Sequence, residues 1–450
     1  MIHQLDLAEA VRAVLPGVRD DLEALVRIPS ISADPGSAEA VRRSADATAA
    51  LFRAEGAKVE ILAVEGGQPA VLARFPAPVG QPTVLLYAHH DVQPTGDPAQ
   101  WTSPPFEPVE REGRLYGRGT ADDKAGIAMH LAAIRAFGGA PPVGVTVLVE
   151  GEEEIGSPTL SQFLATYRDR LAADVIVLAD STNFDLGVPA LTTRLRGLVD
   201  CVVEVRALHH AVHSGMYGGA APDALTALCR LLATLHDDDG EVAIEGLVRG
   251  EPVDLDYPEE RFRREAGVLD GVQLLGEGSI AERLWAKPTA TVLAIDAPRV
   301  SEASNTLQPV ARAKVSVRLA PGDDAARARA ALAEHLRKHA PWGVHVEVHE
   351  GDLGEPYAIP ASGPAYDAAR EAMREAWGRE PVDIGVGGTI PFIAEFARAF
   401  PEASILVTGV EDPDSRAHGA DESLHLGEFE RACLAEALLL AKLAVRDRAG

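Results

Sequence analysis

The sequence predicts an α/β fold with a smaller α+β domain inserted into it, and two observations support this prediction. Short apolar runs that end at polar residues alternate with segments of helical periodicity, first up to about residue 180 and again after Pro356. This alternation is typical of an α/β sheet. Between about 194 and 352 the order changes to β-α-β-β-α-β, which is typical of a small domain with a four-stranded sheet.

The helices of the first part are expected from apolar residues at helical spacing. Residues 5–27 show this spacing, but Pro16 and Gly17 interrupt it, so two helices are expected there. Further helices are expected over 38–55 and 126–137.

Three apolar runs are predicted to be buried strands of the sheet. Each ends at polar residues, and ligands gather at the carboxyl ends of strands in open α/β sheets. The runs cover 83–88, 144–149 and 174–179, and they end at His89-His90-Asp91, at Glu150-Gly151-Glu152-Glu153-Glu154 and at Asp180.

The inserted domain is expected to span 193–352, which leaves 1–192 and 353–450 for the main domain. Its strands are predicted over 198–205, 289–295, 311–319 and 344–348, and its helices over 223–235 and 323–339. The main domain then resumes with a helix over 365–377, a strand over 404–408 and a helix over 426–445.

Composition excludes several classes of partner. The formal net charge is -26, and a surface this acidic repels phosphate backbones, so no nucleic acid is expected. The start of the chain lacks the pattern of a signal peptide, and no stretch is long and apolar enough to span a membrane. The three cysteines are far apart and odd in number, which fits a reducing compartment. A cytoplasmic location is expected.

Histidine and carboxylates at the strand ends point to a metal site. Imidazole is a good zinc ligand, and a carboxylate two residues away, as in His89-x-Asp91, can orient the ring. Asp122 could offer one oxygen to each of two metals, although an aspartate here could equally cap the following helix. In the run of glutamates ending at Glu154, one side chain could bind metal while its neighbour moves protons. A solvated acidic loop is the alternative for that run.

Four motifs occur in order along the chain: His89-x-Asp91-Val92-Gln93-Pro94, Gly117-Arg118-Gly119-x-x-Asp122-Asp123-Lys124, Glu153-Glu154-x-Gly156-Ser157 and His213-Ser214-Gly215-x-Tyr217-Gly218-Gly219. Together they resemble the zinc-dependent di-metal peptidase family of carnosinase-type dipeptidases, aminoacylase, carboxypeptidase G and succinyl-diaminopimelate desuccinylase, with the dipeptidase branch most similar. The resemblance covers nearly the whole chain. It implies a zinc-aminopeptidase-like catalytic domain, with a mixed central sheet flanked by helices, and an inserted dimerisation or lid domain.

The resemblance also implies roles for the residues. Asp122 would bridge two divalent metals, with zinc expected and manganese or cobalt as alternatives for an oxygen and nitrogen ligand set. His89 and Asp180 would complete one metal site, and Glu154 and His418 the other. Asp91 would orient His89, and Glu153 would be the general base for a water shared by the metals.

Substrate contacts and a homodimer are implied as well. His213 resembles a histidine that reaches the active site of the partner subunit. Arg318 and Asn305 resemble groups that hold a substrate carboxylate, for which arginine is well suited. The remaining candidates for substrate contact are Gly388, Thr389 and His349.

The sequence departs from the family pattern at two places, of which the first concerns a helix start and the second the choice of substrate. Ala125 stands where glycine is usual, and residues 355–364 lack the aromatic and histidine pattern of the animal dipeptidases. A dipeptidase that needs a free substrate carboxylate, acting on a small peptide, is the first expectation. A deacylase of N-acyl amino acids is the alternative, and a metal-binding module without turnover is a third hypothesis, which the presence of Glu153 disfavours.

Overall fold

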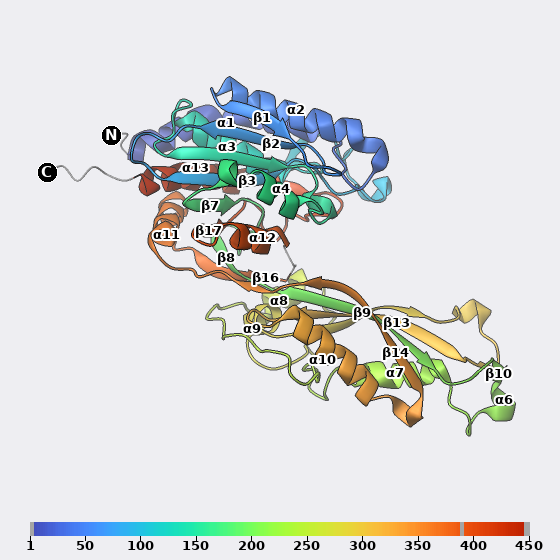
Figure 1. Ribbon diagram of the computed structural model, residues 1–450. Helices are drawn as coiled ribbons and strands as arrows, with labels where there is room; N and C mark the ends of the chain where they lie inside the picture. Colours follow the sequence, from blue (N-terminus) through green and yellow to red (C-terminus); the bar gives the residue numbers. More distant parts are fainter. Residues whose placement is uncertain (1–3, 388–390, 445–450) are drawn as a thin grey trace. The chain divides into compact units, whose positions relative to one another are not determined.

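The computed structural model describes residues 4–387 and 391–444 and divides into two compact units (Figure 1). Unit 1 comprises Met1–Thr193, Pro360–Ile384 and Pro391–Gly450, and unit 2 comprises Arg194–Ile359 and Gly385–Ile390. The chain therefore leaves unit 1 twice, first for the long segment that forms most of unit 2 and then for a short segment that begins at Gly385. The prediction placed the corresponding boundaries at 193 and 352.

Unit 1 is built on a mixed six-stranded sheet. Strands β6, β3, β7 and β17 run parallel to one another, whereas β1 and β2 are antiparallel to their neighbours. The central strands are apolar and almost entirely buried, as expected of strands covered on both faces. The sheet order is β1 (Lys58–Leu62), β2 (Ala70–Phe75), β6 (Gly144–Glu150), β3 (Thr83–His89), β7 (Val175–Leu178) and β17 (Ser404–Val407).

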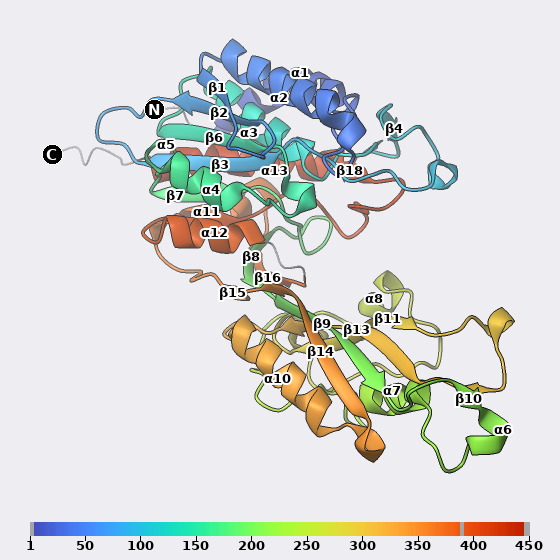
Figure 2. The same ribbon diagram turned by 45° about the vertical axis from the view of Figure 1, so that its right-hand side comes forward.

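Helices cover both faces of this sheet (Figures 1 and 2). Helices α1, α3 and α13 pack on one another, α2 packs on β1 and β2, and α4 packs with α12. The described helices of unit 1 are α1 (Gln4–Val26), α2 (Ala38–Ala54), α3 (Lys124–Ala136), α4 (Leu160–Thr166), α5 (Arg168–Leu171), α11 (Pro364–Trp377), α12 (Pro391–Ala399) and α13 (Leu426–Leu443). A small sheet, in the order β18 (Ser423–His425), β5 (Arg114–Tyr116) and β4 (Val109–Arg111), completes the unit.

The prediction of two helices over residues 5–27 was wrong, because α1 continues through Pro16. Buried apolar residues lie on both sides of the proline, including Val11 and Val18, and they form one stripe against α3 and α13. An interior proline costs a helix roughly 3 kcal/mol. Burial of a continuous stripe outweighs that cost here, since each fully buried Val or Leu contributes about 1.5–3 kcal/mol.

Unit 2 contains an antiparallel four-stranded sheet in the order β11 (Thr289–Asp296), β13 (Val310–Leu319), β9 (Gly197–Arg206) and β14 (His345–Gly354). Helices α7 (Ala224–Ala233) and α10 (Ala325–Lys338) pack on one face of it and enclose a core with Val199, Val203, Val315 and Val317. The predicted β-α-β-β-α-β order is confirmed by β9, α7, β11, β13, α10 and β14.

Unit 2 also carries shorter elements that the sequence did not predict. These are a two-stranded antiparallel sheet of β10 (Val212–His213) and β12 (Thr306–Leu307), together with α6 (Ser214–Tyr217), α8 (Glu259–Glu265) and α9 (Ile280–Trp285). A three-stranded sheet in the order β15 (Tyr357–Ala358), β8 (Ala190–Leu195) and β16 (Val382–Val386) contains the segments where the chain passes between the units. Within residues 4–387 and 391–444, no helix combines the length and apolar character needed to cross a bilayer.

Candidate metal centre

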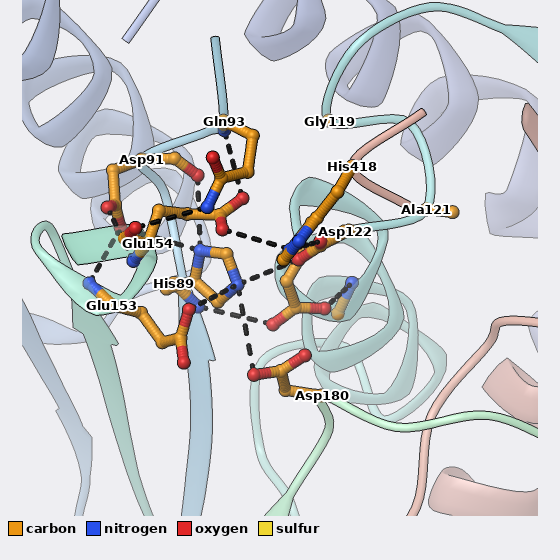
Figure 3. A network of polar contacts seen from close by, with 12 residues as sticks. His89, Asp91, Gln93, Gly119, Ala121, Asp122, Glu153, Glu154, Asp180 and His418 are labelled. Atoms are coloured by element: carbon orange, nitrogen blue, oxygen red, sulfur yellow. Dashed lines mark hydrogen bonds and ion pairs between the residues drawn. The ribbon is translucent and has the colours of Figure 1, made fainter. Parts of the chain in front are cut away.

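His89 is the last residue of β3, and its ring is completely buried. Its Nδ1 lies 3.1 Å from the main-chain oxygen of Asp91, and its Nε2 lies 3.0 Å from Asp122 Oδ1 (Figure 3). A carbonyl oxygen can only accept, so Nδ1 carries the hydrogen. In the neutral ring the lone pair on Nε2 is therefore directed at Asp122, as metal coordination through that nitrogen requires.

Asp122 lies between two histidines that come from distant parts of the chain. Its Oδ1 faces His89, while its Oδ2 lies 3.0 Å from His418 Nε2. The two positively polarised rings hold the pKa of the Asp122 carboxyl well below its usual range, against the effect of burial. One oxygen toward each histidine is the arrangement that a bridging carboxylate needs.

A buried glutamate fixes the loop that presents Asp122. Glu422 accepts hydrogen bonds from the backbone N–H groups of Gly119, Ala121 and Asp122 at 3.0–3.1 Å. Its second oxygen lies 2.5 Å from the Arg118 guanidinium. The next residue, Asp123, caps α3 by accepting from the Gly126 N–H at 3.2 Å. The capping role that was the alternative for Asp122 thus belongs to its neighbour.

The glutamates after β6 divide into two pairs. Glu150 accepts from the Tyr87 hydroxyl at 2.7 Å, and Glu152 accepts from the Gln68 and Thr159 backbones at 2.9 and 2.8 Å. Both are therefore tied to the surrounding structure. Glu153 and Glu154 point instead toward His89 and Asp122 (Figure 3).

Asp91 holds the turn that carries this second pair. Its carboxylate accepts from the backbone N–H of Glu153 at 3.2 Å and from that of Glu154 at 3.0 Å. One of its oxygens also lies 3.4 Å from His89 Nδ1. A single buried aspartate therefore links the end of β3 to the loop after β6, which fits the orienting role expected of it.

Glu154 has one oxygen that the protein leaves without a hydrogen bond. Its Oε1 accepts from the Gln93 N–H at 3.0 Å, but its buried Oε2 has no hydrogen-bond partner and lies 3.2 Å from His418 Nε2. His418 itself has a φ of 63°, in the left-handed region that a non-glycine residue seldom adopts. Such backbone is found at functional sites, where surrounding contacts enforce it.

Carboxylates gather on the other side of His89 as well. Asp180 Oδ2 lies 3.8 Å and Glu153 Oε2 3.9 Å from His89 Nε2. Burial is the main reason that the pKa of Asp180 rises to about 7, and burial followed by the charge of Asp180 raises that of Glu153. The carboxylates of Asp122 and Glu154, 3.0 and 3.2 Å from His418 Nε2, raise the pKa of His418 to about 11. Carboxylates therefore crowd around both histidines of the cluster.

The donor set fits two divalent cations. Ligand atoms of His89, Asp122 and Glu154 lie within 4.8 Å of one another, as do those of His89, Glu153 and Asp180. His418 lies within 3.2 Å of both Asp122 and Glu154. Imidazole nitrogens and carboxylate oxygens without sulfur suit zinc, manganese or cobalt. The cations would supply the positive charge that the crowded, buried carboxylates lack.

The candidates for substrate binding lie in unit 2. His213 and Asn305 come together at the β10–β12 pair of strands, where His213 pairs with Thr306 and the Asn305 carbonyl accepts from the Ser214 N–H at 2.9 Å. His213 is exposed, and its Nδ1 accepts from the Gly215 N–H at 3.1 Å. This strand pair places two of the predicted residues side by side.

The other substrate candidates are more scattered. Arg318 lies on β13 and His349 on β14, with β9 between these two strands. On β9, Val202 is opposite His349. Val202 is also opposite Lys314, which is four residues before Arg318 on β13. The structure therefore does not bring His349 to Arg318. Gly388 and Thr389 lie outside the described residues.

Sequence reasoning missed two acidic residues at the centre. One is Glu422, whose position four residues after His418 was the available signal. The other is Glu411, whose pKa is raised first by burial and then by the nearby charges of Asp122 and Asp180. Nothing in its local sequence distinguishes Glu411 from a loop glutamate.

The fold and this cluster are those of a metal-dependent hydrolase. The chain belongs to peptidase family M20/M25/M40, whose pattern matches residues 85–442. It is therefore an enzyme of the peptidase class, and the resemblance seen in its motifs is confirmed.

Individual relatives agree with this assignment. The chain is 40% identical to a cysteinylglycine-S-conjugate dipeptidase of Corynebacterium striatum, over 81% of this chain and 82% of that protein. It is 26% identical to a Cys-Gly metallodipeptidase of Schizosaccharomyces pombe, over 91% of both chains. The crystal structure of human carnosine dipeptidase 1 superposes with a TM-score of 0.81 at 23% identity, over 98% of both chains, which confirms the α/β fold.

Proposed function

We propose that the protein is a two-metal dipeptidase that hydrolyses the amide bond of small peptides with a free C-terminal carboxylate. The observation that supports this most is the position of Asp122, which offers one oxygen toward His89 and the other toward His418. Two bound divalent cations would activate a shared water and polarise the scissile carbonyl.

Glu153 is the proposed general base. A carboxylate oxygen of Glu153 lies within 4.8 Å of ligand atoms of His89 and Asp180. The Glu153 backbone N–H donates to the Asp91 carboxylate. Burial and the negative charge of Asp180 raise the pKa of Glu153. A carboxyl group with a raised pKa can accept a proton from water and return it to the leaving amine. Glu154, with its oxygen that lacks a hydrogen bond, is the proposed ligand beside it.

The remaining assignments follow the same logic. His89 and Asp180 are proposed to hold one cation, and Glu154 and His418 the other, with zinc as the physiological metal. We propose that Arg318 binds the substrate carboxylate, because a guanidinium can hold a carboxylate with two parallel hydrogen bonds. Asn305 is proposed to assist from unit 2.

Unit 2 is proposed to be a dimerisation domain. Its strand β11 is at the edge of the sheet and exposes Val292, Leu293 and Ile295, with 57% of Leu293 accessible. An exposed apolar edge strand is a template for pairing with another chain. In a homodimer, His213 would be free to serve the partner's site, and a cytoplasmic location fits the three unpaired cysteines.

Metal reconstitution with a substrate panel tests the proposal. The protein would be stripped with chelator, restored with Zn²⁺, Mn²⁺ or Co²⁺, and assayed on free dipeptides, on their C-terminally amidated forms and on N-acetyl amino acids. Cys-Gly and an S-substituted Cys-Gly belong in the panel, because the 40% identical relative is named for that substrate. Metal-dependent cleavage of free dipeptides is expected. A preference for N-acetyl amino acids would refute the dipeptidase assignment while leaving the metal ligands intact.

A further inference from the structure

Arg196 is a buried arginine at the start of unit 2, between β8 and β9. Its side chain is 5% exposed. Its Nη1 donates to the Leu284 carbonyl at 2.8 Å, and its Nη2 donates to Thr289 Oγ1 at 2.6 Å. Both acceptors are neutral, so neither compensates the charge of the guanidinium.

No carboxylate among the described residues balances this charge. The buried Nε of Arg196 has no hydrogen-bond partner. Its pKa is lowered to about 10, first by burial and then by the positive charge of Arg318, and no described acidic group acts on it. A buried charge is ordinarily paired, because removal from water costs several kcal/mol.

The strand register and one hydrogen bond place Arg196 beside the face of the sheet that carries Arg318. Arg318 is directly opposite Leu198 on β9 and opposite Thr289 on β11. Residues opposite one another point to the same face, and so do residues two apart on a strand. Arg196 itself precedes β9, and its Nη2 donates to Thr289 Oγ1, so its guanidinium lies at the Arg318 end of this face. Thr289 links the two arginines, as the strand partner of Arg318 and the hydrogen-bond acceptor of Arg196.

The other cations on this face show what is unusual about Arg196. Lys314 lies 3.0 Å from Asp200, and both Arg312 and Arg206 lie 2.5 Å from Glu204. These three side chains are more exposed than Arg196, so water already stabilises their charges, yet each forms an ion pair with a carboxylate. At the Arg196 end of the face, the described protein supplies a second cation where an anion would be expected.

We propose that Arg196 is a positioning residue for a carboxylate site at Arg318, where it fixes Thr289 and adds a buried positive charge that the substrate carboxylate balances. The inference rests on the proposed function, in which the substrate carries a free C-terminal carboxylate. The substrate carboxylate would contact Arg318, which is partly exposed. The buried Arg196 would act through the electrostatic field of its charge and through its hydrogen bond to Thr289. A charge this deeply buried is screened less by solvent and salt than a surface charge.

Steady-state kinetics on three variants test the proposal. Arg196→Gln is expected to raise KM for a free dipeptide about tenfold, a typical effect of one nearby charge at an effective dielectric constant of about 20, while kcat and the KM for the amidated dipeptide change less than about twofold. Arg196→Lys keeps the charge and should restore most of the affinity. Arg194→Gln is the matched control, because Arg194 lies two residues away and donates to the Glu251 and Pro252 carbonyls. It should behave as the wild type.

The outcomes separate the alternatives. If Arg196→Gln and Arg194→Gln give equal KM values, or if the lysine variant is as impaired as the glutamine variant, Arg196 has only a structural role and the proposal is wrong. Wild-type enzyme that cleaves free and amidated dipeptides equally well would refute the carboxylate requirement in the proposed function instead. In that case, stabilisation by acetate still decides the inference. Acetate should raise the melting temperature of the wild type more than that of Arg196→Gln, and equal shifts would overturn it.

If Arg196→Gln folds poorly, a second variant tests the proposal. Thr289→Val removes the hydroxyl that accepts from Arg196 but keeps both charges. It is expected to raise KM for the free dipeptide about threefold, less than the loss of a charge would, with kcat unchanged. No change in KM would contradict the positioning role of Arg196.

Discussion

Replacing Glu150 with glutamine should stabilise the protein at alkaline pH and change its stability little near pH 5. The Glu150 side chain is 4% exposed at the end of β6. Its Oε2 accepts from the Tyr87 hydroxyl at 2.7 Å, but its buried Oε1 has no hydrogen-bond partner. Burial raises the pKa of this carboxyl from 4.5 to about 7.

The sign follows from proton binding in the two states. The folded protein holds the Glu150 proton more tightly than the unfolded chain does, so the associated stability is present below about pH 4.5 and is lost as the pH rises through about 7. The difference between about 7 and 4.5 corresponds to about 3 kcal/mol at 1.36 kcal/mol for each pKa unit. Glutamine is neutral at every pH, and its oxygen can still accept from Tyr87.

Urea unfolding of the chelator-treated protein at pH 5 and pH 9 would measure this effect. Relative to wild type, the free energy of unfolding of Glu150→Gln should rise by roughly 2–3 kcal/mol between the two pH values. Glu152→Gln is the matched control, since Glu152 is equally buried but accepts from three donors on Gln68 and Thr159. It should destabilise by about 1–3 kcal/mol. A difference between Glu150→Gln and wild type that is the same at both pH values would show that Glu150 is ionised throughout and would refute the reasoning.

Three further predictions concern the metal centre. Glu153→Ala should keep near-normal metal content and lose turnover by at least about a hundredfold, as metal analysis and kcat would show; most of the kcat surviving would contradict the base assignment. His418→Ala should reduce bound metal from two equivalents toward one, measured by atomic emission, because Asp122 and Glu154 lose their nitrogen partner. Glu422→Ala should weaken metal binding by roughly ten- to a hundredfold, because three backbone N–H groups of the 119–122 loop lose their acceptor; unchanged affinity in a chelator competition would argue against that role.

The parts of the centre that lie at strand ends could be predicted from sequence alone. Strands β3, β6 and β7 are neighbours in the parallel part of the sheet, so their carboxyl ends meet at one edge. His89, Glu154 and Asp180 each follow one of those strands. A short apolar run that stops at a polar residue was therefore enough to place all three, because strand direction and sheet burial are local signals.

Asp122 and His418 required the family resemblance, because both lie in loops. Their approach depends on Glu422, which binds the backbone around Asp122 from a position 300 residues later in the chain. No periodicity encodes such a contact. The error at Pro16 has a related cause, since the continuity of α1 is decided by its packing on α3 and α13 and not by its own residues.

Burial by itself does not distinguish a metal ligand from a structural carboxylate at this centre. Glu150 and Glu152 are each 4% exposed; Glu150 ends β6, and Glu152 lies in the turn that carries Glu153 and Glu154. Glu152 is satisfied by three hydrogen bonds, and Glu150, with a pKa of about 7, can be neutral beside Tyr87. Among the described residues, neither belongs to a group of side chains that could hold a metal ion. Glu154 has a buried oxygen without a hydrogen bond that faces His89, Asp122 and His418 from other segments of the chain, and a bound cation would supply the partner that this oxygen lacks.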